Sequence, residues 1–438
     1  METPIFSAEP YIEALHGADL VKQYGKVRQV IGVVIESLGP NMAIGETCDI
    51  SYKRTAEPVL AEVVGFRDNK VLIMPLGELM GIGAGSDVVA HNAPLEIGVT
   101  DHLLGRVLSG LGRPIDGKGT IVAENRQVVT AAPPPPLSRP RVTEPLALGI
   151  RAIDGMLTCG KGQRVGIFAG SGVGKSTILG MIARNTAADV NVIALVGERG
   201  KEVRDFIDRD LGEEGLRRSV VVVSTSDQPA LVRIKAAFVA MTIAEYFRDQ
   251  GLDVMFMMDS VTRFAMAQRE VGLAIGEPTT TRGYTPSVFA LLPKLLERAG
   301  TSENGTITGL FSVLVDGDDM NEPVADAVRS ILDGHIVLSR QLAAANHYPA
   351  IDVLQSVSRV MPDVVDANQY SAASAIRDML ATYKDAEDLI NIGAYVPGSN
   401  PRVDLALSKI EGVRYFLRQG IYETSSYEQT LAKLMSVT

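Results

Sequence analysis

The sequence predicts an α/β protein in three parts: an N-terminal small β-barrel, a central domain with a parallel sheet, and a C-terminal helical domain. Residues 27–95 hold short β-rich segments separated by Gly, Pro and an Asp68-Asn69 turn, which is typical of a small closed barrel. Residues 146–345 alternate continuous apolar strands with helices, as expected for a parallel sheet covered on both faces. Beyond about residue 365 the chain turns helical and more polar.

At 438 residues the chain is long enough for about three domains. The changes in pattern divide it into five segments: an N-terminal docking arm (1–26), the β-barrel (27–95), a linker with a proline-rich strap (96–145), the central domain (146–364) and the helical domain (365–438).

The composition excludes several classes of protein. The 42 basic and 52 acidic residues give a net charge of −10, which argues against nucleic-acid binding as the main function, although a local basic patch stays open. No apolar run approaches the ~18–20 residues of a membrane span, and the acidic N-terminus lacks a secretory pattern. Cys48 and Cys159 are expected to be reduced, buried thiols of a cytosolic protein.

Two segments flank the barrel. Residues 1–26 carry broken helical stripes on either side of Gly17, which fit either a frayed terminal helix or a docking segment for a partner helix or membrane surface. The proline run at 133–136, followed by Pro140, excludes helix interior and central strand. It predicts a stiff, extended strap between the barrel and the next domain.

The strongest motif is VGIFAGSGVGKST at residues 165–177, an apolar strand followed by a glycine-rich loop and a helix start. Such a loop turns backbone N–H groups toward phosphate oxygens, and the helix dipole adds positive potential. Lys175 can reach the β- and γ-phosphates, and the Ser176 hydroxyl is a Mg²⁺ ligand. The alternative is a chance glycine-rich turn. The predicted nucleotide-binding residues are Ala169, Gly170, Ser171, Gly172, Val173, Gly174, Lys175, Ser176 and Thr177.

Two further carboxylates end apolar strands. Asp259 closes VMFMMD and is the Walker-B candidate, which holds Mg²⁺, because ligands bind at the carboxyl ends of such strands. Glu198 follows VIALVG and is placed to polarise the attacking water. The alternative for Glu198 is a surface carboxylate paired with Arg199 or Lys201.

Phosphoryl transfer often uses an arginine from a neighbouring subunit. Arg359, in SVSRVMPD, is the candidate, and a structural ion pair is its alternative role. Arg263 and Arg199 are rival candidates within the central domain. The methionines of VMFMMD are core filler, and the five histidines have no metal-ligand spacing.

These motifs resemble the hexameric rotary-type ATPases, the family of F1 and V1 subunits. The resemblance rests on PAIDVLQSVS and LGRVLSGLGRPIDG, and it covers about residues 27–425. Within that family the chain is similar to the ATPases of flagellar and type III protein export, through IDGMLTCGKGQRVGIFAGSGVGKS, MMDSVTRFAMAQREVGLAIGEPTTTRGYTPSVFALLPKLLERAG and IGAYVPGSNPRVDLAL.

The resemblance implies a RecA-like P-loop ATPase domain that binds ATP and Mg²⁺, in a homohexamer with each ATP at a subunit interface. Glu198 falls on the catalytic glutamate of the family's Gly-Glu-Arg motif, where noncatalytic subunits usually carry Gln. Arg199, the next residue of that motif, is included among the catalytic candidates. Arg359 falls on the arginine finger, and Tyr348 falls near the aromatic residue that stacks on adenine.

The resemblance also implies partners. The N-terminal arm would dock a peripheral, stator-like regulator. The C-terminal helical domain would face a central coiled-coil stalk, export chaperone–substrate complexes and the membrane export gate. The protein would then be cytoplasmic and peripheral at the cytoplasmic face of the inner membrane.

We therefore expect Mg²⁺-dependent ATP hydrolysis that energises flagellar protein export, which the GYTPS stretch at 283–287 favours over a virulence injectisome. A noncatalytic nucleotide-binding ring subunit is a second alternative, which Glu198 opposes. A ring-shaped RNA translocase is a third, but the predicted barrel offers only Tyr52 and Phe66 for stacking and little excess of positive charge.

Overall fold

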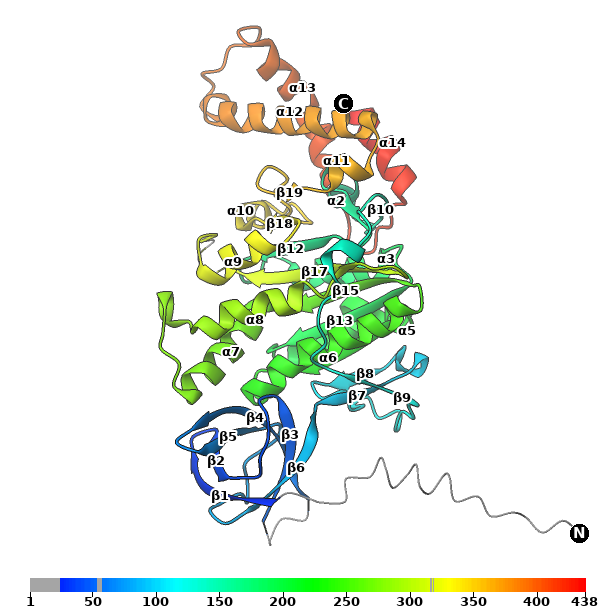
Figure 1. The fold of residues 1–438 in the computed structure, drawn as a ribbon. Coiled ribbons are helices and arrows are strands. Elements are labelled where there is room, and N and C mark those ends of the chain that lie inside the picture. Colours follow the sequence, from blue (N-terminus) through cyan, green and yellow to red (C-terminus); the bar gives the residue numbers. More distant parts are fainter. Residues whose placement is uncertain (1–23, 53–56, 316, 318) are drawn as a thin grey trace, which may run out of the picture. The chain divides into compact units, whose positions relative to one another are not determined.

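The computed structural model describes four stretches of the chain: residues 24–52, 57–315, 317 and 319–438 (Figure 1). The chain divides into two compact units, with the boundary between Leu95 and Glu96. Among the described residues, no helix is both long enough and apolar enough to cross a membrane.

Six antiparallel strands close the N-terminal barrel in the order β1-β2-β5-β4-β3-β6, and β6 pairs back to β1. Their bounds are β1 (Tyr24–Ile31), β2 (Val34–Leu38), β3 (Glu46–Ser51), β4 (Val59–Arg67), β5 (Lys70–Pro75) and β6 (Asp87–Pro94). Fully buried side chains such as Ile35 and Ile73 fill the interior. Asp68 and Asn69 have φ values of 48° and 57°, which suit a two-residue hairpin, so the predicted turn is confirmed.

The barrel begins earlier than the sequence indicated. Tyr24 pairs with Val89, so residues 24–26, which we predicted as part of the arm, belong to β1. Three residues are too few to separate a strand's alternation from a helical stripe. The rest of the predicted arm, with its helical stripes, lies outside the described residues.

The central domain is built on a nine-stranded sheet in the order β19-β18-β12-β17-β15-β13-β14-β8, with β16 paired to β17. All neighbouring pairs are parallel except β16–β17 and β18–β19. The bounds are β8 (Val107–Ser109), β12 (Arg164–Ala169), β13 (Val190–Val196), β14 (Ser219–Ser224), β15 (Asp253–Asp259), β16 (Gly300–Thr301), β17 (Thr306–Leu314), β18 (Gly334–Leu338) and β19 (Val357–Ser358). Every residue of β13 and β14 is buried, as predicted for a covered parallel sheet.

Helices cover this sheet, and α6 packs against β13, β14 and β15. The helices of the central domain are α2 (Arg151–Met156), α3 (Lys175–Asn185), α4 (Gly200–Asp205), the π-helix η3 (Phe206–Leu211), α5 (Gly212–Arg217), α6 (Ala230–Asp249), α7 (Val261–Ile275), the 3₁₀ turn η4 (Thr281–Gly283), α8 (Pro286–Leu296), α9 (Pro323–Ile331), α10 (Arg340–Ala344) and α11 (Met361–Val364).

Residues 96–145 are not a free linker. Strand β8 pairs in parallel with β14 at the sheet edge, while β7 (Glu96–Val99) and β9 (Asn125–Val128) form a separate two-stranded sheet. Two 3₁₀ turns, η1 (Asp101–Leu103) and η2 (Pro136–Ser138), and the short strand β10 (Pro145–Leu146), which pairs with β11 (Cys159–Gly160), complete the segment.

The proline-rich strap is bonded to the central domain. Arg139 donates hydrogen bonds to the carbonyls of Glu297 and Ala299, and the Thr301 hydroxyl donates to the Pro140 carbonyl at 2.7 Å. The predicted strap is thus hydrogen-bonded to the central domain at Arg139 and Pro140, contacts that the sequence did not indicate. A three-residue strand such as β8 carries too little periodicity to be predicted.

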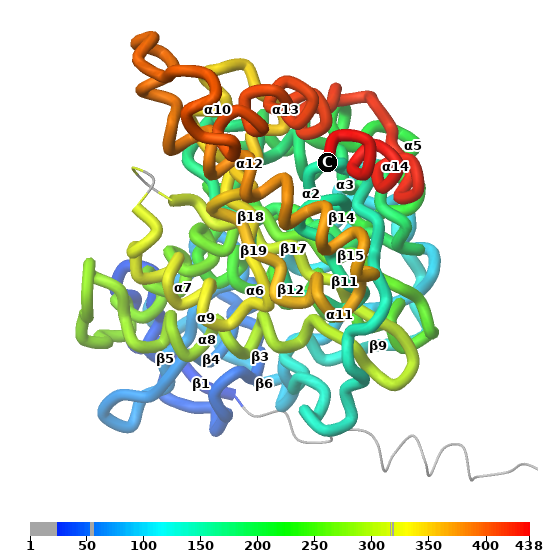
Figure 2. Tube along the Cα trace, turned by 90° about the horizontal axis from the view of Figure 1, so that it is seen from above, coloured from blue at the N-terminus to red at the C-terminus, as the bar shows by residue number. Residues whose placement is uncertain are grey.

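The C-terminal helices α12 (Ala367–Asn391), α13 (Pro401–Leu417) and α14 (Tyr427–Val437) pack around α2 (Figure 2). Their buried side chains, including Ile376 and Phe416, belong to the same apolar cluster as Ile167 of the central sheet. Gly155 of α2 permits this contact, because a Cβ there would lie 2.8 Å from the Phe416 ring. The predicted fold class is thus confirmed, and the helical domain shares a core with the central domain.

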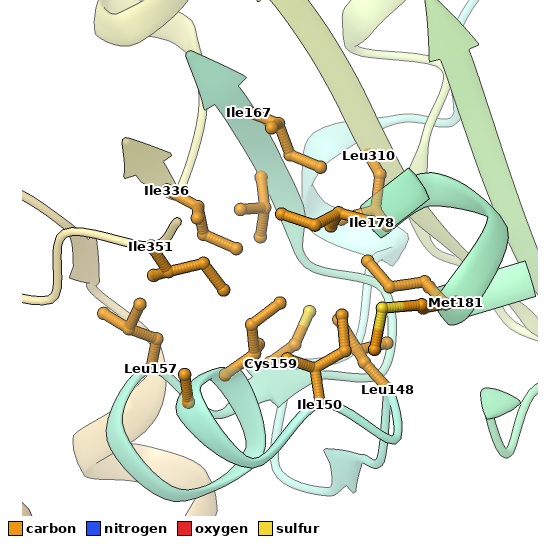
Figure 3. Close-up of a cluster of buried hydrophobic side chains, with 14 of the residues drawn as sticks. Leu148, Ile150, Leu157, Cys159, Ile167, Ile178, Met181, Leu310, Ile336 and Ile351 are labelled. Atoms are coloured by element: carbon orange, nitrogen blue, oxygen red, sulfur yellow. The ribbon is translucent and has the colours of Figure 1, made fainter. Parts of the chain in front are cut away.

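Part of that shared core lies directly behind the phosphate-loop motif (Figure 3). Ile167 of β12 and Ile178 of α3 meet Leu310 of β17 and Ile336 of β18. Cys159 lies in the same cluster, and burial raises the pKa of its thiol far above the usual value. Both cysteines are buried and unpaired with each other, as predicted.

Candidate active site

The loop at residues 170–174 joins the carboxyl end of β12 to the first residue of α3. Gly172 and Gly174 have φ values of 78° and 94°, which only glycine adopts without strain. No side chain caps the N-terminus of α3, so the first N–H groups of the helix are free to bind a ligand. A loop of this kind before a helix N-terminus is suited to a phosphate group.

Lys175 is the first residue of α3, and its side chain extends to Asp259. Its ammonium group forms an ion pair with Oδ1 of Asp259, the last residue of β15. The Ser312 hydroxyl on β17 donates a hydrogen bond of 2.7 Å to the same oxygen. Because β17 separates β12 from β15, the lysine reaches across one strand to the carboxylate.

Glu198 lies two residues beyond β13 at the same edge of the sheet. Its Oε1 is 4.0 Å from the Lys175 ammonium and has no hydrogen-bond partner among the described residues. Burial, together with the nearby charge of Asp259, raises the pKa of Glu198 to about 7, although Lys175 and Arg263 oppose the shift. The Glu198 carboxylate is therefore an acceptor poised to gain a partner or a proton.

Gly197 brings α7 close to this carboxylate. A Cβ at Gly197, where φ is 74°, would lie 2.8 Å from the Cβ of Arg263. The glycine thus allows the stem of Arg263 to pack beside the loop that carries Glu198. Arg263, a rival finger candidate in the sequence, lies at the start of α7 within the same subunit's site.

Tyr348 flanks the phosphate loop. A Cβ on Gly174 would lie 3.8 Å from Cε1 of the Tyr348 ring, and 44% of the Tyr348 surface is exposed. Its carbonyl accepts a hydrogen bond of 2.9 Å from the backbone N–H of Gln419. The ring is therefore free to contact a ligand, while its main chain is held by the C-terminal domain.

The two arginine candidates lie elsewhere. Arg199 is the N-cap residue of α4, with a side chain that is 77% exposed and 3.8 Å from the Glu202 carboxylate. Arg359 follows β19, where its backbone N–H bonds to the Asp333 carbonyl and its guanidinium donates to the Leu332 carbonyl at 3.3 Å. Within the described part of the chain, its guanidinium makes no ion pair.

Arg359 lies at the opposite edge of the sheet from the phosphate loop. Ser358 pairs with Gly334, which is level with Val165 of β12. Ala169, where the loop begins, is four residues farther along that strand, or about 13 Å at ~3.3 Å per residue. Arg359 is thus separated from its own subunit's phosphate loop by this length and by the intervening strand β18.

The donor set suits magnesium. Ser176 is the second residue of α3 and offers a hydroxyl beside the loop, and Asp259 offers a carboxylate at the tip of β15. In the described stretches, no cluster of three or more His, Cys, Asp or Glu residues could hold a metal without help. Mg²⁺ is commonly held by one or two carboxylates together with substrate phosphates, so the residues present fit that ion.

Sequence reasoning missed two members of this arrangement. Ser312 is a polar residue inside the apolar run GLFSVLV, and that interruption is its signal in the sequence. The bond between Gln419 and Tyr348 joins residues far apart in the chain, and nothing in the local sequence announces it.

Three family profiles match the chain. The profile described as the ATP synthase alpha/beta family, nucleotide-binding domain, matches residues 149–358, and the beta-barrel domain of the same family matches residues 27–92. The chain belongs to the ATP synthase alpha/beta family. The third profile, the T3SS EscN ATPase C-terminal domain, matches residues 365–436 and places this family member among the type III secretion ATPases.

Individual relatives agree with this placement. The chain is 55% identical over 428 residues to the flagellum-specific ATP synthase of Bacillus subtilis, covering 98% of each chain. It is 50% identical over 417 residues to the type 3 secretion system ATPase of Xanthomonas euvesicatoria, covering 95% of this chain and 94% of the relative.

A solved structure extends the similarity to three dimensions. The assembled ATPase EscN of the enteropathogenic E. coli type III secretion system matches with a TM-score of 0.90 and 47% identity, over 94% of this chain and 99% of EscN. This family member is therefore an ATPase that binds and hydrolyses ATP, as predicted.

Proposed function

We propose that this ATPase energises the export of flagellar proteins through a type III secretion apparatus. The supporting observation is the 55% identity to a flagellum-specific ATP synthase over 98% of both chains. Export by a virulence injectisome is the second candidate, because a type 3 secretion system ATPase is 50% identical.

In the proposed site, the loop amides of residues 170–174 and the Lys175 ammonium bind the ATP phosphates, with Ala169, Ser176 and Thr177 framing the loop. The Ser176 hydroxyl and the Asp259 carboxylate hold Mg²⁺, which neutralises phosphate charge when bound. The Glu198 carboxylate orients the attacking water and accepts its proton, a role supported by its raised pKa and by its Oε1, which has no hydrogen-bond partner in the described part of the chain.

Two further side chains complete the proposed nucleotide site. Tyr348 stacks on the adenine, which its exposed ring beside Gly174 supports. Arg199 adds positive charge at the mouth of the site, next to Glu198 in the chain. Because Arg199 is mostly exposed, we assign it a minor share of the catalysis.

Arg359 is proposed to act in the site of a neighbouring subunit of a homohexamer. Its place at the amino edge of the sheet, away from its own phosphate loop, supports a role in trans. EscN was solved as an assembled ATPase and also in complex with its central stalk EscO. A ring would bring the Arg359 edge of one subunit to the Glu198 edge of the next.

The partners proposed are those of an export motor at the cytoplasmic face of the inner membrane. The C-terminal helices would face a coiled-coil stalk, export chaperone–substrate complexes and the membrane export gate, and no nucleic acid is expected. The arm at residues 1–26 would dock a stator-like regulator. The EscN–EscO complex, 47% identical to this chain in its ATPase, supports the stalk contact.

A complementation experiment tests the export role. A deletion strain receives the normal gene, Lys175→Ala or the control Lys201→Ala, which changes an exposed lysine. Swimming and filament protein in the medium are scored. We expect the normal gene and Lys201→Ala to restore both, and Lys175→Ala to restore neither. Normal swimming of the deletion strain itself would overturn the flagellar assignment and favour the injectisome.

A further inference from the structure

The end of α13 is fixed to the central domain by one buried arginine. Arg151, the first residue of α2, is 2% exposed. Its guanidinium donates to the carbonyls of Phe416 and Arg418 and forms an ion pair with Glu423. A cation at a helix C-terminus satisfies the last carbonyls and complements the helix dipole. The chain that follows α13 therefore starts from a fixed point.

Gln419 lies one residue beyond that point, is 4% exposed, and uses its whole side-chain amide. Oε1 accepts from the backbone N–H of Arg151 at 2.8 Å. Nε2 donates to the carbonyls of Gly149 and Glu423, each at 2.8 Å. The amide therefore joins the segment before α2 to the segment after α13, and no other residue type offers the same donors and acceptor at this length.

The main chain of the same residue holds Tyr348. The Gln419 N–H donates to the Tyr348 carbonyl at 2.9 Å, while the Tyr348 ring flanks Gly174 of the phosphate loop. Tyr348 is 44% exposed as a residue, so few side-chain contacts hold its orientation. The orientation of Tyr348 thus depends on where the side-chain amide of Gln419 fixes the backbone of residue 419.

We propose that Gln419 is a positioning residue for nucleotide binding. Its amide fixes the backbone donor that sets Tyr348 against the phosphate loop, so the position of the C-terminal helices and the affinity for the adenine base are coupled. The inference rests on the proposed adenine contact of Tyr348. By linkage the coupling is reciprocal, so bound nucleotide strengthens the attachment of α13 as much as that attachment strengthens binding.

The experiment compares Gln419→Leu and Gln419→Glu with the control Gln369→Leu in the full-length protein. Gln369 is 2% exposed and bonds the Asp154 carbonyl and the Thr158 hydroxyl of the same interface, but not Tyr348. Two probes are used: ATP, as KM and as the Kd of a fluorescent ATP analogue, and inorganic tripolyphosphate, a competitive inhibitor that lacks the base.

We expect both Gln419 variants to raise KM and Kd for ATP about three- to tenfold, because part of the base stacking is lost. The Ki of tripolyphosphate and kcat should change less than about twofold, because the phosphate loop is untouched. Gln369→Leu should lower the melting temperature comparably and leave all these constants unchanged. The proposal would be overturned if the Gln419 variants weakened the binding of ATP and of tripolyphosphate equally. It would also be overturned if they changed the binding of neither ligand.

Tyr348→Ala separates the two possible failures. If Tyr348→Ala leaves the affinity for ATP unchanged, the proposed adenine contact fails. If it weakens ATP binding but the Gln419 variants do not, the contact stands and the positioning role of Gln419 fails. In the double variant, Gln419→Leu should add less than about twofold to the effect of Tyr348→Ala, as expected for residues that act through one another.

Discussion

The two ends of strand β15 carry nearly the same set of polar groups in different surroundings. At its amino end, Asp253 pairs with Lys161 at 2.9 Å, and Lys161 also pairs with Glu144 at 3.0 Å. The Thr306 hydroxyl of β17 donates to Asp253 at 2.7 Å. This cluster thus holds one lysine, two carboxylates and one hydroxyl.

At the carboxyl end of β15, Asp259 pairs with Lys175, the second carboxylate is Glu198, and the hydroxyl is that of Ser312, again on β17. The difference is burial: side-chain exposure is 32% for Lys161 against 11% for Lys175.

Burial decides what each cluster can do. At the amino end, the hydrogen bonds that the Lys161 ammonium donates to Asp253 and Glu144 raise its pKa to about 12, so the lysine stays charged. At the carboxyl end, burial and the charge of Asp259 raise the pKa of Glu198 to about 7, and its Oε1 has no hydrogen-bond partner among the described residues. Glu144, the second carboxylate at the amino end, is paired and 69% exposed, whereas Glu198, the second carboxylate at the other end, is buried and available for chemistry.

The largest contrast is expected on removing the two lysines. Lys175→Ala should lower ATPase activity by roughly 10³-fold or more, because phosphate binding and charge neutralisation are both lost. The matched variant Lys161→Ala should keep activity within about twofold. Steady-state hydrolysis of both purified variants measures this, with circular dichroism to verify the fold. Comparable losses in the two variants would erase the distinction between the ends.

The second contrast concerns the second carboxylate of each cluster, Glu198 at the carboxyl end and Glu144 at the amino end. Glu198→Gln should lower kcat by about 10²–10⁴-fold, with KM for ATP changed little, because the amide orients water poorly and takes no proton. Glu144→Gln is the control, since its carboxylate is 69% exposed and belongs to the cluster at the other end of β15. A Glu198→Gln enzyme with near-normal kcat would remove Glu198 from the mechanism.

A pH profile sharpens the same comparison. Only ionised Glu198 can accept a proton, so kcat/KM should fall about tenfold per pH unit below about 7. Glu198→Gln should lack this limb. In the folded state the raised pKa stabilises the protein below the ordinary carboxyl pKa of 4.5, and this contribution is lost as the pH rises through about 7. A flat kcat/KM between pH 5.5 and 8 would contradict the assignment.

The smallest effect is expected at the amino end of β15, where the Lys161 cluster contributes to stability. Lys161→Met breaks two partly exposed ion pairs and should lower the free energy of unfolding by about 0.5–1.5 kcal/mol. Turnover per folded molecule should stay constant. Denaturant unfolding followed by far-UV circular dichroism gives the first quantity. A large fall in kcat, with stability unchanged, would reverse the roles assigned to the two clusters.

Local signals explain what the sequence could predict. The phosphate loop, Asp259 and Glu198 each follow an apolar strand within a few residues, and parallel strands bring such ends together at one edge. The order of strands was not predictable, because nothing in VMFMMD states that β17 lies between it and β12.

Contacts between distant segments escaped prediction for the same physical reason. The edge strand β8 is three residues long, and its pairing with β14 depends on the whole sheet. The bond from Gln419 to Tyr348 forms only once α13 has packed on α2. Both follow from tertiary packing, which hydrophobic periodicity does not encode.

The most direct test of the shared-site mechanism mixes two inactive variants. Arg359→Ala subunits retain Glu198, and Glu198→Gln subunits retain Arg359, so about a quarter of the interfaces in a random ring of equal parts should be complete. As a control, Glu198→Gln is mixed with Lys175→Ala. Each of these subunits lacks one of the two residues that a single site needs from its own chain. This mixture should therefore complete no site. We predict that co-assembled Arg359→Ala and Glu198→Gln regain hydrolysis, and that normal specific activity rises with protein concentration as rings form. No recovery in the mixture, with activity independent of concentration, would contradict the trans role of Arg359.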